Sequence, residues 1–157
     1  MIPRAAYCFD TSAFIQCWTR HYPPDLFPGM WEKLNTIAVQ NVIVSPEEVR
    51  YEIEKKEDRL HEWVKARAYL FAPLDEEVQK AAQSVLASYP LLVKATAQRT
   101  QADPFVIALA QVNTIPVVSE ERGGSANKPK IPYVCNALGI PCMTVVEFIR
   151  SQGWQFT

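Results

Sequence analysis

The sequence predicts a three-layer α/β/α sandwich in which a central parallel sheet of four to five strands lies between helices. The chain has 157 residues, of which 48% are apolar and 21% charged, as in an ordinary globular domain. Its apolar segments are short and continuous rather than alternating, which is typical of strands buried on both faces. Helical segments separate these strands, as the crossover connections of a parallel sheet require. We therefore expect a single domain over residues 1–157.

Four short segments, rich in apolar and β-branched residues, are the predicted strands. They cover residues 5–9, 42–44, 115–119 and 140–143. The first strand ends at Asp10 and the second at Ser45, so that polar side chains begin where the apolar runs stop.

Helices are predicted in the stretches between the strands. They cover residues 11–18, 28–38, 46–70 with a break near 57, 75–87, 102–112 and 144–152. Pro23 and Pro24 stop the first helix, which Thr11 or Ser12 can cap, so we expect the charge of Asp10 to be redundant as a cap.

Two capping boxes are expected at helix starts. In the first, Ser45 caps the helix, Pro46 occupies its first position and Glu48 reaches back to the free amide. Thr144 and Glu147 form the second, before a final helix that Gly153 closes.

Composition excludes several classes of function. Twelve prolines beside five glycines, with neither a GxGxxG nor a P-loop pattern, argue against a nucleotide cofactor. Residues 120–132 are expected to form a loop. The formal net charge is -1, so a nucleic acid would need a local basic patch or bound cations.

The sequence also predicts a cytoplasmic protein. Its apolar runs are far shorter than the roughly 18 residues of a membrane span, and the amino terminus does not resemble a secretory signal. The four cysteines lack CxxC spacing, which favours buried, reduced thiols over zinc or disulfides.

Acidic residues collect at one edge of the predicted sheet. Ligands of open parallel sheets bind beyond the carboxyl ends of the strands. Asp10 follows the first strand, Glu52 lies in the second turn after the second strand, and Glu120 and Glu121 follow the third. Asp103 begins a helix that runs antiparallel to the strand it feeds, which places it at the same edge.

This convergence predicts a divalent metal ion. Several carboxylates at one place repel one another unless a cation lies among them. Oxygen ligands without histidine select Mg²⁺ or Mn²⁺, and such an ion suits hydrolysis of a phosphodiester. Spacing does not decide which of Glu120 and Glu121 turns inward. Arg122, Lys128 and Lys130 are candidates for phosphate contacts, although a solvated charged loop explains them equally well.

Each acid also has an explanation outside a site. Glu52 could be a solvated helix residue. It lies, however, on the flank of the apolar face of its helix, whereas Glu54 points away from that face. Asp103 before Pro104 is also a standard helix cap. Asp103 on its own therefore does not distinguish a functional acid from a cap.

Four segments resemble the PIN-domain nucleases, and in particular the PIN-like toxins of prokaryotic toxin–antitoxin modules related to VapC. The segments are "YCFDTSAFI", "VIVSPEEVRYEIE", "ADPFVIALA" and "IPVVSEE", in the family's order. The resemblance implies a PIN-like α/β/α sandwich and Mg²⁺- or Mn²⁺-dependent cleavage of RNA, usually restrained by a co-encoded antitoxin. It also allows a homodimer.

The resemblance maps Asp10, Glu52 and Asp103 onto the family's metal-binding acids, and matches Thr11 or Ser12 to the small hydroxyl after the first aspartate. The expected catalytic acids are Asp10, Glu52, Asp103 and Glu121, and the expected metal ligands are Asp10, Asp103, Glu52 and Glu120. The expected substrate-binding residues are Thr11, Ser12, Ser119, Arg122 and Lys128. The chain departs from the family after the last catalytic strand, where it reads Ser119, Glu120, Glu121, Arg122 in place of the usual aspartate pattern.

The competing hypothesis is a PIN-like scaffold that binds RNA or a partner protein without cutting. Its four tryptophans could form a docking patch, although such residues at helical spacing more often lie in the core. A serine hydrolase is disfavoured because the G-x-S-x-G turn is missing, and Ser12 stands where a dehalogenase-type phosphatase needs a second aspartate.

Overall fold

A five-stranded parallel sheet forms the middle layer of the protein. The computed structural model describes residues 6–93 and 101–156. The strands lie in the order β3-β2-β1-β4-β5. Their bounds are β1 Tyr7–Phe9, β2 Ile43–Pro46, β3 Phe71–Ala72, β4 Val117–Val118 and β5 Cys142–Met143. The predicted sandwich and its parallel sheet are therefore confirmed.

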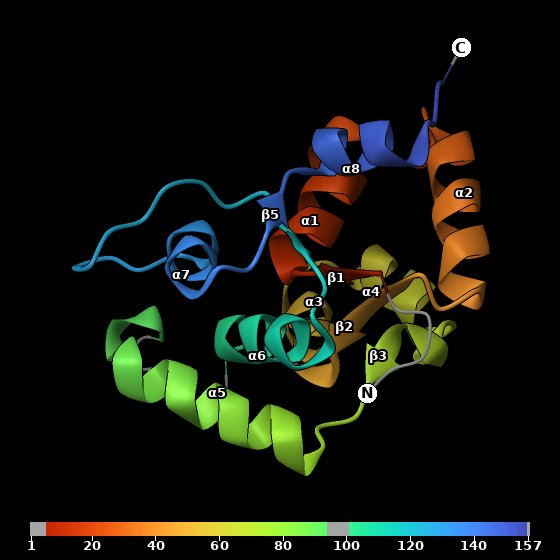
Figure 1. The fold of residues 1–157 in the computed structure, drawn as a ribbon. Helices are drawn as coiled ribbons and strands as arrows, with labels where there is room; N and C mark the ends of the chain where they lie inside the picture. The colour runs from red at the N-terminus through yellow and green to blue at the C-terminus, as the bar shows by residue number, and fades with distance from the viewer. Residues whose placement is uncertain (1–5, 94–100, 157) are drawn as a thin grey trace.

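Helices cover both faces of this sheet. They are α1 Thr11–Gln16, α2 Pro28–Val39, α3 Glu47–Lys56, α4 Asp58–Lys65, α5 Glu76–Ser88, α6 Asp103–Asn113, α7 Ile131–Leu138 and α8 Val145–Gln152. A π-helical turn, Cys17–His21, follows α1, and short 3-10 turns lie at Ala68–Leu70 and Pro90–Leu92. In Figure 1, α5, α6 and α7 lie on one side of the sheet, and α1, α2 and α8 lie on the other.

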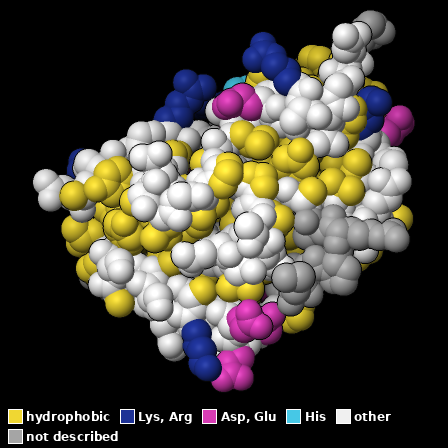
Figure 2. Space-filling view, in the orientation of Figure 1, with side chains coloured by type: hydrophobic (Ala, Val, Ile, Leu, Met, Phe, Trp, Pro, Cys, Tyr) yellow, Lys and Arg dark blue, Asp and Glu magenta, His cyan; other side chains and the backbone are white. Residues whose placement is uncertain are grey.

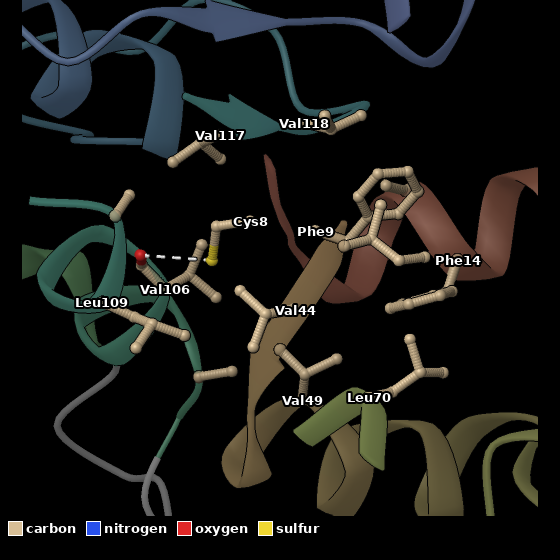
Figure 3. Packing of buried hydrophobic residues seen from close by; sticks show 14 of the residues in the cluster. Cys8, Phe9, Phe14, Val44, Val49, Leu70, Val106, Leu109, Val117 and Val118 are labelled. Atoms are coloured by element: carbon tan, nitrogen blue, oxygen red, sulfur yellow. Dashed lines mark hydrogen bonds between the residues drawn. The ribbon is translucent and has the colours of Figure 1, made fainter. Parts of the chain in front are cut away.

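Alternate residues of the central strand face the two helical layers. Cys8 is buried toward α6, where its thiol donates to the carbonyl oxygen of Val106 at 3.6 Å. Phe9 points the opposite way and packs on Phe14 of α1 and Phe148 of α8. Figure 3 shows the first two of these contacts, with Cys8 directed at α6 and Phe9 at α1. Burial on both faces explains why this strand is continuously apolar.

The local predictions were mostly right for helices. The break at Glu57, the helix after Asp75 and the helix from Asp103 are confirmed. The capping box of Thr144 and Glu147 is present, and Gly153 ends α8 with a left-handed φ of 71°. Two elements were missed, namely the edge strand β3 and helix α7, whose first residues lie in the predicted 120–132 loop.

Two predictions about helix starts were wrong. Asp10 itself caps α1, because its carboxylate accepts from the Ala13 amide at 2.8 Å, so its charge is not redundant there. The capping box at residues 45–48 is absent from the described structure. Ser45 instead donates to the Phe9 carbonyl oxygen at 2.6 Å across the sheet, and β2 continues through Pro46.

The face drawn in Figure 2 carries apolar side chains across its middle, with acidic and basic side chains toward its margins. That face therefore presents no continuous basic surface to a polyanion, as the small net charge predicts. Within residues 6–93 and 101–156, no helix is long and apolar enough to cross a membrane.

Candidate active site

A cavity of about 780 Å³ opens where the chain leaves β1 and β4. The strand order reverses here, because β2 follows β1 on one side while β4 lies on the other, and such a switch point is where parallel sheets bind ligands. Four acids from four separate segments line the cavity: Asp10, Glu52, Asp103 and Glu121. These are the four acids that the sequence predicted as catalytic.

Asp10 is the most enclosed of these acids, at 2% exposure. Ser119 donates to its Oδ2 at 2.6 Å, the Ala13 amide donates to Oδ1 at 2.8 Å, and the Ser12 hydroxyl reaches both oxygens at 2.8 and 2.9 Å. These donors fix the position of the carboxylate. Burial nevertheless raises the pKa of Asp10 from 3.8 to about 7, with the nearby charge of Glu121 adding to the shift.

The two serine hydroxyls also hold the loop that follows β4. The Ser12 oxygen accepts from the Glu120 amide at 3.0 Å, and the Ser119 oxygen accepts from the Glu121 amide at 3.0 Å. Both hydroxyls are therefore used within the protein as donors and as acceptors. The expected contact of Ser12 and Ser119 with the substrate stays a prediction. In the structure, their hydrogen bonds position Asp10.

The structure separates the two glutamates that spacing could not distinguish. Glu121 lines the cavity and accepts a hydrogen bond from the Ile131 amide at the start of α7, while its Oε2 is buried without a partner in the described structure. Glu120 is outside the residues that line the cavity. Its Oε1 accepts from the Val145 amide at 3.4 Å and lies 4.0 Å from His21 Nε2.

Glu52 and Asp103 are the other two acids that line the cavity. Glu52 accepts from the Thr11 hydroxyl and, through Oε2, from the Ala102 amide at 3.2 Å. It thereby joins α3 to the start of α1 and to the residue before α6. Asp103 is the first residue of α6 and follows Ala102, which occupies the N-cap position. Asp103 therefore does not occupy the N-cap position that the standard-cap explanation requires.

Mutual repulsion and burial dominate the electrostatics of the cavity. Desolvation and then the charges of Glu121, Asp10 and Glu52 raise the pKa of Asp103 well above its usual value. Burial likewise raises the pKa of Glu121, although the charge of Lys130 opposes this. The protonated forms of Asp103 and Glu121 are therefore favoured more than in a free carboxyl group, and additional positive charge in the cavity would oppose this.

Three lysines line the cavity but form no ion pairs with its acids among the described residues. Lys56, Lys128 and Lys130 line it, and all three are exposed. The ion pairs of the described residues join His21 to Glu120, His61 to Glu54 and Lys80 to Glu76, so none neutralises the four acids. The predicted Arg122 is exposed and lies outside the cavity lining. Lys56 was missed, although its i+4 spacing from Glu52 places the two on one helix face.

The donor set fits a hard divalent cation in its chemistry. All four acids supply oxygen, Glu121 has a buried oxygen without a partner among the described residues, and the charges of Glu121, Asp10 and Glu52 raise the pKa of Asp103. Across the described residues, the side chains of His, Cys, Asp and Glu do not come together in a ready group of three for a metal ion. Mg²⁺ commonly binds through one or two carboxylates and keeps several waters, so a closed protein cage is not required.

Comparison with known proteins identifies both a family and a fold. A family model described as "Domain of unknown function (DUF4411)" matches residues 7–156. The comparison with curated proteins finds no match.

Two solved structures are similar in fold at low sequence identity. VapBC2 from Rickettsia felis, bound to a DNA fragment from their promoter, gives a TM-score of 0.52 at 11% identity, covering 88% of this chain and 98% of that chain. FitAcB from Neisseria gonorrhoeae gives a TM-score of 0.51 at 12% identity, covering 87% and 96%. At such identities the likeness shows the fold, which agrees with the expected PIN-like sandwich.

Proposed function

We propose that this chain, which belongs to the DUF4411 family, is a PIN-like nuclease that hydrolyses RNA with the help of Mg²⁺ or Mn²⁺. One observation carries the proposal. Asp10, Glu52, Asp103 and Glu121 come from four distant segments and meet in one cavity at the switch point of the sheet. Such a concentration of carboxylates, which the ion pairs of the described residues leave unpaired, costs folding stability, and a site for a cation explains it.

The side chains divide into those that would hold the ion and those that would support them. Asp10, Asp103 and Glu121 line the cavity and would hold the ion, and Glu52 would support them through its bonds to Thr11 and to the Ala102 amide. A bound divalent ion would activate water and stabilise the charge that develops on the attacked phosphodiester. Ser12 and Ser119 hold Asp10 in place, which limits its reorganisation during the reaction.

The border lysines would contact the phosphates of the substrate. Lys128 and Lys130 belong to the loop between β4 and α7, and Lys56 belongs to α3, so the cavity has positive charge on two sides. This placement supports a polyanionic substrate in a protein whose net charge is only -1.

A partner protein that restrains this activity is part of the proposal. The PIN-like toxins that the sequence resembles are usually held inactive by a co-encoded antitoxin. The similarity in fold to VapBC2 and FitAcB supports such a partner for this chain.

Cleavage of single-stranded RNA by the purified protein tests the proposal. We expect cleavage with Mg²⁺ or Mn²⁺ and its loss with EDTA. Asp10→Asn and Asp103→Asn should each lower the rate by at least about a hundredfold. The matched control is Glu76→Gln, which removes an exposed carboxylate of α5 outside the cavity and should leave the rate unchanged.

Two outcomes would contradict the nuclease. One is cleavage that persists in EDTA and in both aspartate variants. The other is RNA binding without cleavage in the presence of either ion, which is the result expected of the non-cutting scaffold.

A further inference from the structure

The cavity that holds the four acids also has an apolar lining. This lining consists of Ile15, Leu91, Leu92, Val93 and Pro129. Leu91 is 63% exposed, and of the large exposed hydrophobic side chains within residues 6–93 and 101–156 it alone lines the cavity. Apolar side chains left exposed at a cavity commonly mark a surface that binds a ligand.

Helix α1 places the apolar lining next to the acids. The residues of this helix that line the cavity are Thr11, Ser12, Ile15 and Gln16, whose spacing puts them on one helix face. Ile15 lies one turn after Thr11, a rise of about 6 Å, and the helix begins directly after Asp10. A ligand bound at the acids therefore has the apolar lining within its reach.

The turn that carries Leu91 is anchored by its neighbours. It is the 3-10 turn Pro90–Leu92, in which the buried Leu92 donates its amide to the Tyr89 carbonyl oxygen at 3.0 Å. The Tyr89 ring packs edge-on against the ring of Tyr133 in α7, with 6.4 Å between the ring centroids. Leu91 is therefore an exposed side chain on a turn that is fixed to the body of the protein.

We propose that the apolar lining binds one unpaired base of the substrate, with the adjoining phosphate at the acids. This inference rests on the proposed function and adds which part of the RNA the cavity selects. Nucleic-acid bases have a π-face, on which side chains pack, and a polar edge. Ile15 and Leu91 can contact the face of a base, and the amide of Gln16, which follows Ile15, can donate or accept at its edge.

The charge and the size of the cavity both match an unpaired nucleotide. Lys56, Lys128 and Lys130 line the cavity from α3 and from the loop before α7, and the ion pairs of the described residues include none of them. An apolar lining together with lysines suits a chain that combines bases with phosphates. A volume of about 780 Å³ is that of a small-ligand site, so a base enters only after it leaves the pairing and stacking of a duplex.

Fluorescence anisotropy of labelled RNA, titrated with the folded protein in EDTA, tests this inference. Three probes of equal length are compared, namely single-stranded RNA, the same RNA annealed to its complement, and a ribose-phosphate chain without bases. We expect the single strand to bind about tenfold more tightly than the baseless chain, which carries the same charge. It should also bind more tightly than the duplex, whereas recognition of phosphate charge alone would favour the duplex.

A leucine variant and its control locate the contact with the base. Leu91→Ala should weaken the binding of single-stranded RNA about fivefold and leave that of the baseless chain unchanged. Because Leu91 is exposed, the variant should keep the wild-type fold, which circular dichroism checks. The matched control is Leu26→Ala, since Leu26 is 70% exposed and lies outside the cavity lining, and it should change neither affinity.

The outcomes separate this inference from the nuclease proposal. Four results would overturn it even in a protein that cleaves RNA with Mn²⁺. They are no RNA binding in EDTA, equal affinities for RNA and the baseless chain, tighter binding of the duplex, and an unchanged affinity of Leu91→Ala for single-stranded RNA. Conversely, a base-dependent affinity that Leu91→Ala lowers would support the inference even if the protein binds RNA without cutting it.

Discussion

Asp10 combines structural and chemical roles in one carboxylate. It caps α1 through the Ala13 amide and accepts hydrogen bonds from Ser12 and Ser119, yet burial still raises its pKa to about 7. Three donors therefore do not fully replace the water that this carboxylate loses. The folded protein therefore places a carboxyl group with a raised pKa in the lining of the cavity, which is common where a residue serves chemistry.

The raised pKa of Asp10 predicts that stability without divalent ions depends on pH. Between its unfolded value of 3.8 and about 7, the folded state binds this proton and the unfolded state does not. The free energy of unfolding should therefore fall as the pH rises through this range. Asp10→Asn removes the effect. The free energy of unfolding of the variant, relative to that of the wild type, should therefore increase by about 1–4 kcal/mol between pH 4 and pH 8.

Urea unfolding in EDTA at a series of pH values measures this difference. A gap between variant and wild type that stays constant from pH 4 to pH 8 would contradict the account of Asp10.

The two neighbouring glutamates should respond differently to metal. Glu121 lines the cavity and its buried Oε2 has no partner among the described residues, whereas Glu120 lies against Val145 and His21. Glu121→Gln should remove most of the stabilisation that millimolar Mn²⁺ gives the wild type, about 1–3 kcal/mol. Glu120→Gln should keep it. Melting curves with and without Mn²⁺ decide the matter, and equal losses in both variants would be evidence against the assignment.

At the scale of elements, the capping box at the start of α8 tests whether neighbouring residues alone stabilise a helix start. The Thr144 hydroxyl accepts from the Glu147 amide at 3.2 Å, and the Glu147 carboxylate accepts from the Thr144 amide at 3.1 Å. Thr144→Ala should cost about 1 kcal/mol of stability. Thr36→Ala is the control, because Thr36 is exposed within α2 and only bonds back to the Glu32 carbonyl oxygen.

The shift of the urea midpoint measures both variants. Thr36→Ala should match the wild type or exceed it slightly, since alanine is the better helix former. A loss in Thr36→Ala as large as that in Thr144→Ala would show that the capping box has no particular role.

Sequence predicted those elements whose signals are local. The Thr144 cap, the break at Glu57 and the helix after Asp75 depend on neighbouring residues and were predicted correctly. The expected Ser45 cap failed because the hydroxyl bonds to the Phe9 carbonyl oxygen on the adjacent strand, a contact that only the folded sheet creates. Strand β3 has two residues, Phe71–Ala72, which is too short for any period to appear.

At the scale of the molecule, topology explains why the acids could be found. In a parallel sheet, residues that follow strands share one edge, so Asp10 and Glu121 meet although more than a hundred residues separate them. Topology does not fix side-chain direction, and hence it left Glu120 and Glu121 undecided. The support of Asp10 by Ser12 and Ser119 depends on three-dimensional packing between two segments, for which the sequence carries no periodic signal.

The position of Mn²⁺ in crystals soaked with that ion tests the central claim most directly. We predict an anomalous-scattering peak within the cavity, bound by oxygens of Asp10, Asp103 and Glu121, and its loss in crystals of Asp10→Asn. A wild-type cavity without a peak at millimolar Mn²⁺, with the four carboxylates still gathered there, would contradict the claim that these acids exist to bind a divalent ion.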